Sequence, residues 1–122
     1  MRHGHAQARF LQGVYPFAGR GVFEPCPLSN ALSHVVPENK TAEVVYFRAG
    51  NLSDALLYLT LTANSLAVRY FPIGARADIH VPLVIVESYP AGTCFDVCLA
   101  APRGVNGTVV LDIGLVEVDA GR

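Results

Sequence analysis

The chain has 122 residues, of which 52% are hydrophobic and only 16% are charged, and its formal net charge is −1. This hydrophobic content excludes a disordered polymer, and nine basic against ten acidic residues disfavour a nucleic-acid-binding protein. So few charges predict an unusually apolar surface, and surfaces of that kind usually contact another molecule.

Residues 1–40 are rich in glycine and proline, and include Pro16, Pro25, Pro27 and Pro37. Proline removes a backbone donor and fixes φ, so this stretch is not expected to form one regular element. Its apolar side chains must nevertheless be covered. We therefore expect an irregular N-terminal arm, not an independent domain, that lies across its own chain or across a neighbouring subunit.

Beyond residue 41, short apolar runs alternate with turn residues. The runs cover residues 42–49, 55–62, 65–71, 77–86, 93–100 and 107–118. Short strands separated by glycine and proline turns are typical of a sandwich or barrel, and Asn106 followed by Gly107 favours a hairpin. The sequence predicts an all-β protein, with an antiparallel β-sandwich of immunoglobulin-like or jelly-roll-like type over residues 41–122.

Side-chain alternation separates a core face from a second face in each strand. The expected core faces are Ala55, Leu57, Leu59 and Leu61, then Phe95, Val97 and Leu99, then Val109, Leu111, Ile113 and Leu115. The second faces stay partly apolar, with Leu56, Tyr58, Val110, Val116 and Val118, whereas a solvated face should be polar. We expect the arm or another subunit to cover them.

Three cysteines are too few for a disulfide scaffold. On one strand, Cys94 and Cys98 would lie about 13 Å apart on the same face, which is beyond the reach of a disulfide. We expect them to be unbonded packing residues. The spacing does not indicate whether Cys26 pairs with either of them.

The histidines supply the candidate metal ligands. His3 following a free amino terminus would offer square-planar nitrogens to Cu(II) or Ni(II), and His5 would add an axial donor. His80 shares a face with Asp78, and Pro82 on that face indicates an edge strand. A single imidazole completes neither a catalytic triad nor a three-ligand metal site, so a histidine at a sheet edge is the simpler interpretation and no cofactor is predicted.

The sequence contains neither a G-x-S-x-G nucleophile motif nor a glycine-rich phosphate loop, so no motif indicates a particular enzymatic reaction. Aromatic and arginine side chains are common interface anchors. The candidate interaction residues are Tyr15, Phe17, Phe23, Arg69, Tyr70 and Phe71, with the sandwich core as the alternative place for the aromatic ones.

These observations favour a non-catalytic β-sandwich that associates with itself or with a protein partner. Two other classes stay open: a domain that binds a small ligand or metal, and an enzyme whose site is completed between subunits. There is no apolar run long enough to span a membrane and no apolar segment of a signal peptide, so we expect a cytoplasmic protein. A single lysine among nine basic residues suggests a GC-rich bacterial genome.

Overall fold

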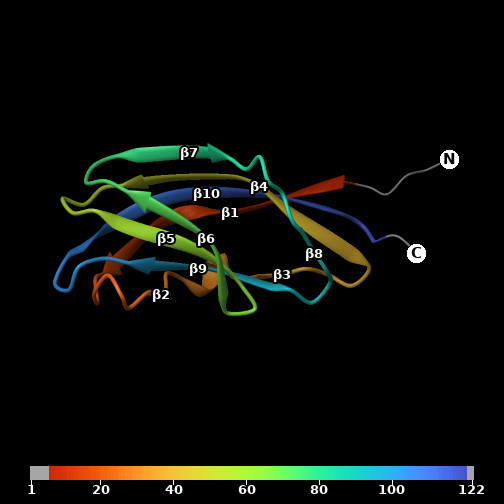
Figure 1. Cartoon of the computed structure of the whole chain (residues 1–122), viewed down its shortest axis with the longest axis horizontal. Coiled ribbons are helices and arrows are strands. Elements are labelled where there is room, and N and C mark those ends of the chain that lie inside the picture. Colours follow the sequence, from red (N-terminus) through yellow and green to blue (C-terminus); the bar gives the residue numbers. More distant parts are fainter. Residues whose placement is uncertain (1–5, 121–122) are drawn as a thin grey trace.

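The computed structural model describes residues 6–120, which form an antiparallel β-sandwich (Figure 1). Sheet A contains, in spatial order, β1 (Ala6–Ala18), β10 (Asn106–Asp119), β4 (Lys40–Asn51) and β7 (Asp78–Pro82), and β8 (Ser88–Tyr89) also pairs with β4. Sheet B contains β2 (Cys26–Pro27), β9 (Cys94–Ala100), β5 (Leu57–Ala63) and β6 (Leu66–Ile73), and β3 (His34–Val35) also pairs with β9. The predicted all-β sandwich is confirmed.

The strand order is that of a jelly roll. Along the chain, β4 lies in sheet A and β5 in sheet B, and β9 lies in sheet B and β10 in sheet A. The chain therefore crosses repeatedly between the two sheets, as in double-sheet jelly rolls. Within residues 6–120 the sole helical turn is η1 (Asn30–Leu32), and that part of the chain holds no helix able to cross a membrane.

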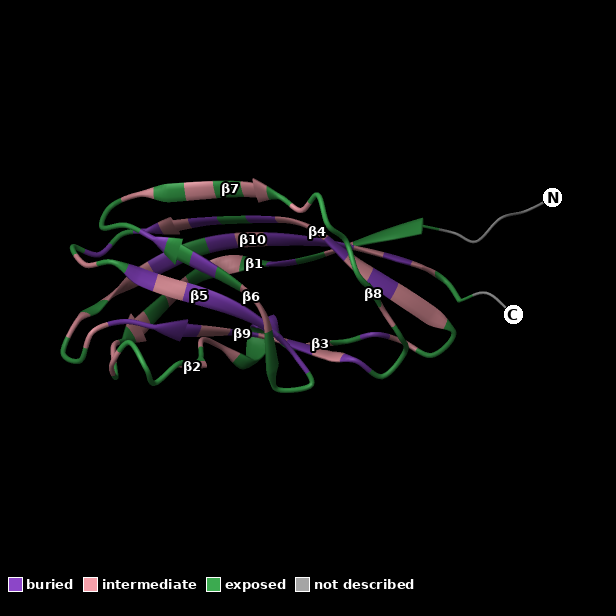
Figure 2. Cartoon of the chain, in the orientation of Figure 1, coloured by how far each residue is buried: buried purple, intermediate pink, exposed green. Residues whose placement is uncertain are grey.

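The core lies between the sheets, on the faces that alternation predicts. The predicted inward residues of β5, β9 and β10 are at most 4% exposed: Leu57, Leu59, Leu61, Phe95, Val97, Leu99, Val109, Leu111, Ile113 and Leu115. Figure 2 shows these buried positions running through β10 and β5, while β7 and the turns are more exposed. Ala55 precedes β5 and is only half-buried. Phe47 of β4 stacks on Phe71 of β6 with ring centroids 3.7 Å apart, which joins the two sheets.

The N-terminal segment is more regular than its prolines suggest. All 13 residues of β1 pair with β10, from Ala6 opposite Val118 to Ala18 opposite Asn106. Pro16 is tolerated because β1 is an edge strand, where a missing donor need not break a ladder hydrogen bond. The expectation of an irregular arm needs correction here, because β1 is an integral strand of the sandwich.

Candidate interaction surface on sheet A

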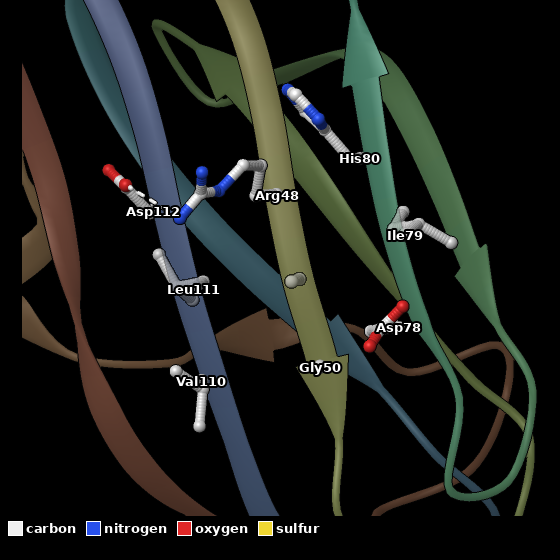
Figure 3. A pocket seen from close by; sticks show the side chains of 9 residues that line it. Arg48, Gly50, Asp78, Ile79, His80, Val110, Leu111 and Asp112 are labelled. Carbon is white, nitrogen blue, oxygen red and sulfur yellow. Dashed lines mark ion pairs between the residues drawn. The ribbon is translucent and has the colours of Figure 1, made fainter.

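The outer face of sheet A carries a shallow hollow of about 460 Å³ where β10, β4 and β7 run side by side. Gly50 of β4 lies opposite both Val110 of β10 and Asp78 of β7 in the strand register. Because Gly50 has no side chain, the backbone of β4 is open between these two neighbours (Figure 3). The hollow thus exists because a glycine stands at the centre of a three-strand row.

The next row of the hollow is charged. Arg48 of β4 lies opposite Asp112 of β10 and His80 of β7. Its guanidinium reaches toward β10, with Nη2 3.6 Å from an Asp112 oxygen (Figure 3). The predicted edge position of His80 is confirmed, because β7 is an edge strand of sheet A. No metal-holding group of three or more His, Cys, Asp or Glu occurs within residues 6–120.

Tyr46 bounds this row and connects three strands. Its hydroxyl donates a hydrogen bond to Asp112 over 3.0 Å, and its ring meets the His80 ring edge-on at 6.2 Å. Burial, and then the hydrogen bond to Asp112, raises the pKa of the Tyr46 phenol, so it stays a donor at neutral pH. The same ring lies against Gly114, where a Cβ would come within 2.1 Å of it.

Toward β1 the outer face of sheet A becomes apolar. Phe10 and Val14 of β1 are 54% and 63% exposed, and Val110 of β10 is 40% exposed. Val14 lies opposite Val110, and Phe10 lies opposite Gly114. We call Phe10, Val14 and Val110 the apolar stripe. It is uncovered because β1 extends this sheet at its edge and does not lie across it.

The candidate interaction residues differ in how far they are exposed. Tyr15 and Phe17 are half-buried and pack against the core, while Phe23 and Tyr70 are 89% and 63% exposed. Phe71 is 5% exposed and stacks on Phe47, so its expected place at an interface is corrected to the core.

Arg69 is half-buried, and its side chain contacts the loop that follows β7. It donates to the Ile85 carbonyl over 3.2 Å and lies 3.7 Å from a Glu87 oxygen. The predicted metal ligands His3 and His5 lie outside the described residues.

The three thiols lie on or near sheet B. Cys26, Cys94 and Cys98 are all free, as expected for two cysteines held apart on β9. Burial, and then the negative charge of Asp96 between them, raises the pKa of both the Cys94 and Cys98 thiols. These thiols are therefore protonated packing groups at neutral pH.

A buried carboxylate that sequence reasoning missed joins both sheets. The side chain of Glu117 is 0% exposed, and it accepts hydrogen bonds from Arg9 Nε over 2.9 Å and from His34 Nε2 over 2.6 Å. Burial raises the pKa of Glu117, but the hydrogen bonds and charges of His34 and Arg9 outweigh burial and lower that pKa. The signal in the sequence is one acidic residue that continues the apolar inward face of β10.

The chain matches no family model and no curated protein. A chain of infectious bursal disease virus, Gx strain, is similar in fold, with a TM-score of 0.58, 13% identity, and coverage of 98% of this chain and 34% of that one. Eiger TNF from S. frugiperda has a TM-score of 0.54, 12% identity, and coverage of 99% and 96% respectively. This chain spans only about a third of the viral chain. At these identities the similarity shows a shared jelly-roll-like fold.

Proposed function

We propose that this chain is a non-catalytic subunit that associates with copies of itself through the apolar stripe on sheet A. The main observation is that Phe10, Val14 and Val110 are exposed apolar side chains on the outer face of β1 and β10, with Gln12 between the first two, and that residues 6–120 leave this face uncovered. Burying apolar surface stabilises an association by about 25 cal/mol per Å² before the entropic costs of binding. The stripe therefore supplies a driving force for association.

The distribution of charge on this face supports the proposal. The outward positions of β1 hold no charged residue, while Arg48 and Asp78 lie on β4 and β7 and Asp112 lies on β10, opposite Gln12 of β1. Interfaces commonly have a core depleted in charge and a polar rim. The stripe fits the core of such an interface, and the charged hollow fits its rim.

Light scattering of the full chain as a function of concentration tests the proposal. We expect a mass that is a multiple of 13.1 kDa. Replacing Phe10→Ser and Val14→Ser together should lower the mass to that of one chain. Phe23→Ser is the matched control, because Phe23 is more exposed than either residue but lies outside the stripe. A single-chain mass throughout the micromolar range, or dissociation caused by the Phe23 control, would overturn the proposal.

A further inference from the structure

The edge strands of the sandwich differ in how well they are protected against pairing with another strand. The edge strand β7 carries Asp78, His80 and Pro82 within five residues, and the edge strand β6 carries Arg69 and Pro72. Charges and prolines at an edge block the addition of a further strand. The other edge of sheet B is formed by β2 and β3, which are only two residues long each.

The edge strand β1 lacks these protections over most of its 13 residues. Its one charged residue is Arg9, whose Nε hydrogen-bonds the buried Glu117 carboxylate over 2.9 Å. Its one proline, Pro16, lies near the C-terminal end of the strand. Among residues 6–120, β1 is thus the long edge of this sandwich that is open to another strand, although its Gln12 carbonyl already accepts one hydrogen bond, from the Tyr15 hydroxyl over 3.1 Å.

The backbone of β1 shows which groups are free. The N–H of Gly19, directly after the strand, donates to the Val105 carbonyl over 2.6 Å, on the side of β10. Backbone groups alternate along a strand, so the odd-numbered residues of β1 face β10 and the even-numbered residues face the open edge. Pro16 agrees with this assignment, because its missing N–H falls on the open side.

The free N–H groups belong to Ala6, Ala8, Phe10, Gln12, Val14 and Ala18, and Pro16 separates Ala18 from the other five, which are centred on Phe10. We infer that two copies of the chain pair antiparallel through β1 about a two-fold axis at Phe10, so that sheet A continues across both molecules. Ala6 then faces Val14 of the second copy, Ala8 faces Gln12, and Phe10 faces its own equivalent. The inference rests on the proposed self-association and specifies its geometry.

The register follows from the same groups. With the axis at Phe10, each of the five free N–H groups before Pro16 meets a partner strand, and Pro16 and Ala18 lie beyond the paired segment. A shift of the pairing toward the C-terminal end places Ala6 opposite Pro16, which has no N–H to donate.

The pairing also brings the apolar stripes together without opposing like charges. The outward side chains of β1 are uncharged, and the two Phe10 side chains lie next to each other on the outer face of the joined sheet. The occupant of this edge is a second copy because the free segment is complementary to itself. A two-fold contact of this kind closes on itself and yields a dimer.

A proline placed on the open side tests the backbone pairing while the stripe stays intact. Gln12→Pro removes an N–H that faces the open edge, and Gln12→Ser is the matched control that keeps it. We expect Gln12→Pro to weaken dimerisation at least tenfold and Gln12→Ser to leave it unchanged, as measured by light scattering. Equal dimerisation of both variants would overturn the inference.

Spin-label distances give a second test that does not depend on proline. Labels are attached to single cysteines at Ala6, Ala8, Gln12 or Val14 in a background of Cys26→Ser, Cys94→Ser and Cys98→Ser. At about 3.3 Å per residue, the separation along the strand should be about 13 Å at Ala8 and Gln12 and about 26 Å at Ala6 and Val14.

The outcomes distinguish the two proposals. Equal distances on either side of Phe10 support the pairing. Distances that change steadily from Ala6 to Val14 in a protein that still self-associates overturn the pairing and leave the proposed function standing. A monomeric full chain without dipolar coupling overturns both.

Discussion

Nε2 of His34 lies 2.6 Å from an oxygen of Glu117, and this hydrogen bond ties sheet B to sheet A. The other Glu117 oxygen accepts a hydrogen bond from Arg9 of β1. The carboxylate is buried, and both hydrogen bonds are stronger there than in water because the local dielectric constant is lower. This cluster fixes the open edge strand to the body of the sandwich, which is where the proposed dimer contact lies.

Glu117→Gln should lower the free energy of unfolding by about 2 kcal/mol, because the charged acceptor of two hydrogen bonds is lost inside the protein. Urea denaturation followed by circular dichroism measures the change. Asp54→Asn is the control, since Asp54 is 83% exposed in its ion pair with Arg76 and should leave the midpoint unchanged. Equal stability of Glu117→Gln and the wild type would show that the cluster does not stabilise the fold.

The lowered pKa of Glu117 predicts loss of stability in acid. An acid whose pKa is lower in the folded state binds more protons when unfolded, so its stabilisation is complete above its ordinary value near 4.5. That contribution is lost as the pH falls below 4.5 toward the folded pKa. Urea midpoints measured from neutral pH to pH 3 should fall less steeply for Glu117→Gln than for the wild type. Parallel curves would contradict this prediction.

Gly114→Ala should destabilise the protein by about 1–3 kcal/mol, because the new methyl group overpacks the Tyr46 ring. A Cβ at Gly114 would lie 2.1 Å from the ring, whereas one at Gly50 would make an ordinary 3.8 Å contact with Asp78. Gly50→Ala, on the same outer face of sheet A but in β4, is therefore the control and should be tolerated. Thermal unfolding of both variants checks the pair, and similar melting temperatures would contradict the close approach.

Phe71→Ala should cost about 3–5 kcal/mol of stability, as expected for removing a buried aromatic ring. Tyr70→Ala, next to it in the chain, should cost far less, because Tyr70 is 63% exposed and Phe71 only 5%. Denaturant titration of the two variants measures the difference. A larger loss for Tyr70→Ala would mean that the inward and outward faces of β6 are exchanged.

Much of the fold is readable from the sequence because the period of a strand is local. Alternation alone places Phe95, Val97 and Leu99 inside, and the structure buries them. The same local logic keeps Cys94 and Cys98 apart and identifies the edge strand that holds His80 and Pro82. The partly apolar second faces are also visible in the sequence, but alternation does not tell which of them stays open.

The tertiary structure decided where β1 lies and which groups form its contacts. Proline and glycine made residues 1–40 look irregular, yet Pro16 is harmless when its nitrogen faces an open edge. Phe10 and Val14 become an exposed row only because β1 pairs with β10 in one register. Glu117 is likewise accepted inside because Arg9 and His34, distant in sequence, meet it there. Local pattern fixes which face of a strand is apolar, whereas pairing between distant strands decides which faces and edges remain uncovered.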